Sequence, residues 1–371
     1  MEFVNETKVE AGWTLGFERD GRELLVVVVK ATYALPRNGG VPELALEQVK
    51  LTGPDMFIGE PGLSAPLYET DYAHRKPLCD VLINARAYSP SGRMVEQVPV
   101  GIRVGSMVKK FLVCGRRVWR KGVVGASASP PEPFNVMPIS YDTAFGGVDD
   151  TQGDPQKIRT FVENPVGRGY FHYTDKIEGR PLPNTEEIGA SINNPRVPYR
   201  PMALGPVGRN WQPRARFAGT YDARWLEHQA PFWPDDFDYR YFQAAAVDQQ
   251  MPYPAGGEQV VLMNLSPTGN LSFTLPSVSM PVLCIPRRGP DRSVDAVIDT
   301  IVIEPELGRF MLTWRAGLPL RRNCFELKQV IAGEMPPAWH RARRFGTKPY
   351  YHGLGELVRA RQAARATRAP K

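Results

Sequence analysis

Glycine and proline together supply 70 of the 371 residues, 34 as Gly and 36 as Pro. Proline lacks a backbone donor and glycine is entropically costly inside a helix, so both residues interrupt helices and mark turns. This content argues against a helical bundle and favours short strands joined by many turns. We therefore predict a mainly β protein built from sandwich-like antiparallel sheets.

Several stretches have the pattern of paired antiparallel strands. In the region 94–104, valine and isoleucine alternate with other residues, as in a half-buried strand, and Pro99 indicates an edge strand or a bulge. A Gly-Ser turn then leads into a strand at 108–114. The expected hairpins are 24–35 with 41–51, 80–88 with 94–104, 259–265 with 271–275, and 296–304 with 309–315.

The periodicity fades between residues 122 and 256, where proline, glycine and aromatic residues dominate. Short helices are expected at 185–191 and 222–228, with Asp222 as the N-cap of the second. The most irregular stretch is 204–242. Because ordering such a segment costs conformational entropy, we expect it to be functional or held by its own side chains. Its candidate partner-binding residues are Trp211, Tyr221, Phe232, Trp233, Tyr239 and Tyr241, with Trp233 expected to be more exposed than Trp225.

The net charge of +7 is concentrated at the C-terminal end. Residues 339–371 contain nine Lys or Arg and one Glu, which gives the tail +8 and leaves −1 for residues 1–338. Leu354, Leu357 and Val358 predict a short basic helix there. The expected organisation is an N-terminal β region (1–121), an irregular central region packed on the sheets (122–256), a second β region (257–335) and a basic tail separable from the fold (336–371).

The sequence contains few signs of catalytic chemistry. It has no phosphate-binding or dinucleotide-binding glycine motif, and its four cysteines and five histidines are widely spaced. The acidic cluster of Asp235, Asp236 and Asp238 could serve a carbohydrate-active hydrolase, or its carboxylates could accept backbone N–H groups in turns and pair with nearby arginines. We favour the second interpretation, and expect no catalytic residue, metal or cofactor.

The N-terminal residues, the apolar runs and the basic tail predict the cellular compartment and the classes of binding partner. The first residues contain no basic segment followed by an apolar one, and the longest apolar run, 24–29, is too short to span a bilayer. We therefore expect no signal peptide and a cytoplasmic location. The tail is rich in arginine with little aromatic interleaving, and we expect no nucleic-acid partner.

An ordered set of sequence blocks resembles a bacterial type VI secretion adaptor/chaperone family that was long catalogued as a domain of unknown function. The resemblance spans about residues 3–280 and excludes the tail. The blocks are LLVVVVKATY (24–33), KPLCDV (76–81), VCGRRVW (113–119), MPISYDTAFGG (137–147), NPVGRGY (164–170), LPN (182–184), GTYDARW (219–225), PDDFDYRYFQAAA (234–246) and the stretch 257–276.

The resemblance implies a non-enzymatic adaptor that binds a cognate effector protein, which can carry a PAAR-like domain, and promotes its loading onto the VgrG-type spike. A structural component of the spike and the hydrolase named above remain the alternatives. The family supplies no catalytic or cofactor residue. The residues of its blocks that we expect to set turns and anchors of the fold are Gly146, Gly147, Asn164, Pro165, Gly167, Gly169, Gly219, Thr220, Tyr221, Asp222, Trp225, Asp235 and Asp236.

Overall fold

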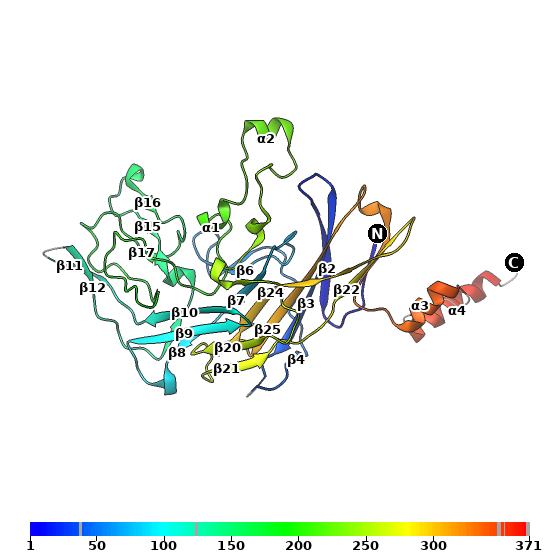
Figure 1. Ribbon diagram of the computed structural model, residues 1–371, viewed down its shortest axis with the longest axis horizontal. Helices are drawn as coiled ribbons and strands as arrows, with labels where there is room; N and C mark the ends of the chain where they lie inside the picture. The colour runs from blue at the N-terminus through cyan, green and yellow to red at the C-terminus, as the bar shows by residue number, and fades with distance from the viewer. Residues whose placement is uncertain (37–38, 123–124, 347–349, 352, 369–371) are drawn as a thin grey trace.

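The computed structural model describes residues 1–371 except 37–38, 123–124, 347–349, 352 and 369–371. A large sheet occupies the middle of the molecule (Figure 1). Its strands, in spatial order, are β19 (Gln250–Met251), β7 (Cys79–Ile83), β24 (Val297–Glu304), β25 (Arg309–Pro319), β3 (Glu23–Ala34) and β2 (Glu10–Phe17), with β4 (Glu43–Leu44) paired to the end of β3.

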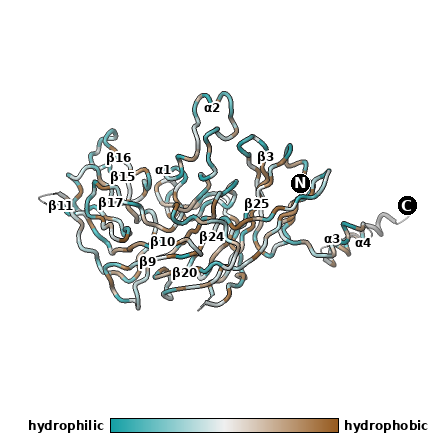
Figure 2. Tube along the Cα trace, in the orientation of Figure 1, coloured by the Kyte–Doolittle hydropathy of each residue, from teal (hydrophilic) through white to brown (hydrophobic). Residues whose placement is uncertain are grey.

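The long apolar run of β3 is explained by burial on both faces of the large sheet. Leu25, Val27 and Val29 pack into the main hydrophobic core, whereas the alternate side chains Leu24, Val26 and Val28 pack against Leu51 and Tyr72. Strands covered on both faces lose the polar alternation of half-exposed strands. Figure 2 shows hydrophobic colouring along β24 and β25, which lie next in the same sheet.

A second sheet closes the main core from the other side. Its strands, in spatial order, are β18 (Thr185–Glu186), β10 (Met107–Cys114), β9 (Gln97–Val104), β20 (Gln259–Met263) and β21 (Leu271–Thr274). The alternating valines and isoleucine of β9 face that core, as predicted. Pro99, however, lies in a central strand rather than at an edge. The pairing of β9 with β20 ends at Gly101 and Met263, before it reaches Pro99. Pro99 therefore has no β20 partner to which a backbone N–H would have to donate.

A terminal sheet joins the two ends of the folded region. It contains β1 (Glu2–Asn5), β26 (Leu327–Ala332), β22 (Pro281–Pro286) and β23 (Arg292–Asp295), with β1 parallel to β26. Each of these three sheets combines strands from before residue 121 with strands from after residue 257. The central region adds only the short strands β18 and β19 to them. The mainly β, antiparallel prediction is confirmed, and the sheets cross the expected region boundaries.

Three local predictions are wrong. Residues 80–88 and 94–104 do not form a hairpin, because the fully buried β7 pairs with the distant β24 in parallel while β8 (Arg86–Tyr88) pairs with β13 (Val136–Pro138). Residues 185–186 form the edge strand β18 instead of a helix, and Glu186 is buried in an ion pair with Arg117. Of the strand expected at 41–51, only β4 forms.

The central region is a set of short elements around small cores of its own. Trp119, Phe145 and Phe171 belong to one such core, and Tyr141 and Trp211 to another. Its further strands are β12 (Gly125–Ala128), β14 (Phe145–Gly146), β15 (Val148–Asp149), β16 (Arg159–Thr160) and β17 (Arg168–Gly169), and its helices are α1 (Gln212–Ala215) and α2 (Ala223–His228). β12 pairs with β11 (Trp119–Gly122) at the start of the region. The small pair β5 (Met56–Phe57) and β6 (Pro66–Tyr68) belongs to the N-terminal region. Single 3-10 turns lie at Pro90–Gly92, Tyr141–Thr143, Pro155–Lys157, Tyr239–Phe242, Val247–Gln249, Pro305–Leu307 and Cys324–Glu326.

The basic tail is helical, as predicted, and consists of α3 (Pro337–Phe345) and α4 (Leu354–Arg368). It extends away from the sheets at one end of the molecule (Figure 1). Its first part contacts the body, because Trp339 and Tyr350 pack against a small cluster on the terminal sheet formed by Ile285, Ile331 and Met335.

Candidate functional site

The irregular stretch 204–242 contains a loop that rises from the body and carries α2 at its tip (Figure 1). We call residues 217–238 the α2 projection. Its base is closed by a backbone hydrogen bond of 3.0 Å from Asp238 N to Phe217 O. Asp222 caps α2 by accepting the N–H of Trp225 at 2.8 Å, as the sequence predicted.

The aspartates of the acidic cluster hold the α2 projection in shape. Asp236 accepts both the N–H and the hydroxyl of Thr220, and these bonds lower the pKa of its carboxyl group. Asp238 accepts from the Arg240 guanidinium, which lowers its pKa in the same way. Asp235 accepts from the Gln229 amide at 3.0 Å. Each of the three carboxylates therefore accepts a hydrogen bond from a neighbouring backbone or side-chain group, which is the arrangement that the turn-building interpretation predicts.

Gly219 illustrates how tightly the two arms of the projection meet. Its φ of +83° is a conformation that side chains rarely adopt, and a Cβ at this position would lie 2.9 Å from Cβ of Pro234. Gly146 plays the same part in the MPISYDTAFGG block. A Cβ there would lie 2.1 Å from the carbonyl oxygen of Asn164, and the buried Asn164 amide donates to the carbonyls of Tyr141 and Phe145.

The other expected fold-setting residues meet at the same junctions. Gly146 and Gly169 are paired in the β14–β17 ladder, and a Cβ at Gly147 or Gly167 would lie against backbone atoms of the facing segment. Pro165 is half-buried between Asn164 and this ladder. These glycines allow the two blocks to approach each other at backbone distance.

The predicted partner-binding aromatics divide by burial. Trp211 is only 3% exposed and packs edge-on against Tyr141, so its ring belongs to the core and offers no docking surface. Trp233 is half-buried, stacks on Phe237 at 4.3 Å and donates its indole N–H to the carbonyl of Phe17.

Trp225 is half-buried as well and donates its indole N–H to the carbonyl of Phe232, so both tryptophans combine partial burial with a hydrogen bond to a backbone carbonyl. Tyr239 and Tyr241 are half-buried at the base of the projection.

Three large apolar side chains remain exposed on the projection: Tyr221, Leu226 and Phe232. Leu226, at 69% exposed, was not predicted from the sequence. The sequence carried no signal for it, because α2 has only six residues and is too short for an apolar period to show which side chains face outward. A cleft of about 560 Å³ runs beneath α2 and is lined by Thr220, Asp222, Arg224, Trp225, His228, Gln229, Pro234, Asp235 and Asp236.

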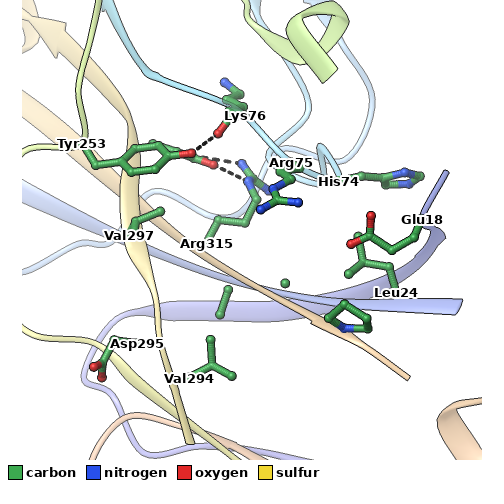
Figure 3. Close-up of a pocket in the computed structure, with 14 residues that line it drawn as sticks. Glu18, Leu24, His74, Arg75, Lys76, Tyr253, Val294, Asp295, Val297 and Arg315 are labelled. Carbon is green, nitrogen blue, oxygen red and sulfur yellow. Dashed lines mark hydrogen bonds and ion pairs between the residues drawn. The ribbon is translucent and has the colours of Figure 1, made fainter. Parts of the chain in front are cut away.

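A pocket of about 250 Å³, which we call the basal pocket, lies on the large sheet near the base of the projection (Figure 3). Figure 3 shows Arg315 on the sheet below the loop that carries His74, Arg75 and Lys76. Glu18, on its rim, accepts the hydroxyl of Tyr239 at 2.6 Å, which ties the projection to the end of β2.

Buried ion pairs engage three of the charged groups that line the basal pocket: Lys76, Asp299 and Arg315. Arg315 pairs with Asp299 and also donates to the carbonyls of Asp71 and Ala73. The His74 ring packs against Phe242 and Trp233, and burial lowers the pKa of its imidazole. These contacts fix the loop and the projection on the sheet.

Asp80 links two blocks of the sequence that lie far apart in the chain. Its fully buried carboxylate accepts from Lys76 at 2.7 Å, from the Gln243 amide at 2.7 Å, and from the backbone N–H groups of Ala244 and Ala245. KPLCDV and FQAAA are therefore two halves of one polar contact. Sequence reasoning missed this role because the partners are separated by more than 160 residues.

Two further observations concern metals and membranes. Within the described ranges, no three His, Cys, Asp or Glu side chains gather closely enough to hold a metal ion. The helices of the described residues are all too short or too polar to cross a bilayer.

Comparison with known proteins places the chain in one family. No curated protein and no solved structure matches it. The family described as "Uncharacterized protein conserved in bacteria (DUF2169)" matches residues 20–315, which include β7, β24, β3 and most of β25 of the large sheet, the whole second sheet and the α2 projection. Because this match covers well over half of the sequence, the chain belongs to this conserved bacterial family.

Proposed function

We propose that the protein is a non-catalytic adaptor that binds a cognate effector of a type VI secretion system and promotes its loading onto the VgrG/PAAR spike. The secretion context comes from the resemblance of the ordered blocks. One structural observation carries the binding role: the α2 projection presents Tyr221, Leu226 and Phe232 to solvent on a scaffold held by its own hydrogen bonds.

A rigid, projecting apolar surface suits protein recognition. Exposed apolar groups that cluster on an ordered element mark interaction sites more often than single scattered residues do. Aromatic anchors bind well because they bury much surface at little entropic cost. Since the aspartates of the projection are engaged in turns and caps, they support this surface instead of a hydrolytic centre.

The test is a binding measurement between the purified chain and the effector candidates encoded beside its gene. Leu226→Ala combined with Tyr221→Ala is expected to weaken binding by about thirtyfold or more, equivalent to about 2 kcal/mol, without changing the melting temperature. Leu46→Ala, which also truncates an exposed leucine, is the matched control.

Three outcomes contradict the proposal in different ways. Undiminished effector binding by the double variant removes the projection as the interface. Glycan hydrolysis that is lost in Asp235→Asn or Asp236→Asn supports the hydrolase. Stoichiometric recovery of the chain in secreted spikes supports a structural component of the spike.

A further inference from the structure

The basic tail combines a docked base with an uncovered outer part. At the base, Trp339 and Tyr350 pack on the terminal sheet, and the Arg343 guanidinium pairs with Asp291 at 2.7 Å. Beyond these contacts the tail extends into solvent (Figure 1). It also lies outside residues 20–315, the part of the chain that the family shares.

Large apolar side chains are exposed on the outer part of the tail. Phe345 is 62% exposed, Leu354 is 80% exposed and Val358 is 49% exposed. Arginines flank them on both helices, and the side chains of Arg341, Arg344, Arg359 and Arg361 are exposed too. Trp339 and Tyr350, which pack on the body, are half-buried. Among the described residues of the tail, Phe345, Leu354 and Val358 are the large apolar side chains that the body leaves uncovered.

We propose that the tail binds the surface of membranes that contain anionic lipids. Helices that lie in the membrane interface combine arginine or lysine with exposed Trp, Phe or Leu side chains. The arginines would contact the phosphate headgroups, and Phe345, Leu354 and Val358 would enter the boundary between headgroups and acyl chains. The charge of +8 on residues 339–371 matches an anionic surface, to which each basic residue adds attraction.

The apolar side chains favour a lipid surface over nucleic acid. A nucleic-acid backbone would engage the arginines through its phosphates. It would leave three large aliphatic or aromatic side chains in water. A bilayer interface accommodates both groups at once, so the two partners predict different effects of removing the apolar side chains.

The experiment is sedimentation of the full chain with vesicles. Vesicles of mixed phosphatidylglycerol and phosphatidylcholine are expected to bind the chain, and vesicles of phosphatidylcholine alone to bind it much more weakly. Binding should fall as salt is raised, because headgroup attraction is screened. The variant Phe345→Ser/Leu354→Ser/Val358→Ser should lose about tenfold or more in affinity for the anionic vesicles.

A matched triple variant controls for the loss of exposed apolar residues in general. Phe325→Ser/Leu46→Ser/Val41→Ser removes the same kind of side chains from exposed positions outside the tail and should bind anionic vesicles like the unmodified chain. Equal melting temperatures of both triple variants would show that each one folds.

Two results overturn the inference. One is absence of binding to anionic vesicles, or binding that the tail triple variant retains in full. The other is tighter binding to duplex DNA or RNA than to vesicles with no effect of the serine substitutions, which identifies nucleic acid as the partner. Effector binding plays no part in this measurement, so the result is independent of the proposed adaptor function.

Discussion

At the residue scale, the fully buried carboxylate of Asp80 joins Lys76, Gln243 and two backbone N–H groups in one contact. The substitution Asp80→Asn removes its charge and leaves the Lys76 ammonium buried without an ion-pair partner, because Lys76 is also almost fully buried. Breaking one partner of such a pair costs about 3–5 kcal/mol of unfolding free energy. Urea denaturation measures this cost. Asp20→Asn, which breaks the exposed pair with Arg22, should change stability little, and equal effects of the two substitutions would contradict the assignment.

Lys109 predicts a pH dependence at the same scale. Burial lowers the pKa of its ammonium group to about 8, although Asp248 lies at 3.1 Å. Between about pH 8 and the unfolded value of 10.5, the unfolded chain binds more protons at this site than the folded chain. The stability contribution of Lys109 therefore rises with pH across this window.

The measurement compares the unfolding free energy of the unmodified chain and of Lys109→Met from pH 7 to pH 10.5. The difference should be constant below pH 8 and then shift in favour of the unmodified chain, on the order of 3 kcal/mol in total. A difference that stays flat across the whole range would mean that Lys109 titrates normally.

At the element scale, the α2 projection depends on the close approach of its two arms at Gly219. Gly219→Ala forces a positive φ on a side-chain-bearing residue and places its Cβ against Pro234, so it should loosen the projection by about 1–3 kcal/mol. The expected result is faster proteolysis within residues 217–238. Gly269→Ala has a similar φ of +91° with open space around the added Cβ, so its loss of unfolding free energy reports the backbone strain without the steric clash. An equal loss of unfolding free energy in both variants would rule out a close-approach effect.

At the scale of the whole molecule, the tail is attached to the body more firmly than its composition indicates. Truncation after residue 336 removes Trp339 and Tyr350 from the cluster on the terminal sheet and should lower the melting temperature by about 2–6 °C. Truncation after residue 353 retains both aromatic residues and should leave the melting temperature within about 1 °C of the full chain. Identical melting temperatures of all three proteins would restore the expectation of a fully separable tail.

The sequence by itself determined the elements that depend on near neighbours. The hairpins β20–β21 and β24–β25, the pairing of β9 with β10 and the capping of α2 by Asp222 all formed as predicted. In each case, alternation, turn residues or a capping side chain act over a few residues. The turn-building role of the aspartates in the α2 projection was predictable for the same reason.

The tertiary structure decided which distant segments meet and which side chains stay exposed. β7 has no alternation to show its partner, and its pairing with β24 joins residues more than 200 positions apart. The ion pair of Asp299 with Arg315, the burial of Trp211 and the exposure of Leu226 likewise depend on what packs against each residue. Residue type and spacing encode local hydrogen bonding, whereas burial is a property of the assembled sheets, which is why the exposed side chains of the α2 projection could be told from the buried ones only in the folded molecule.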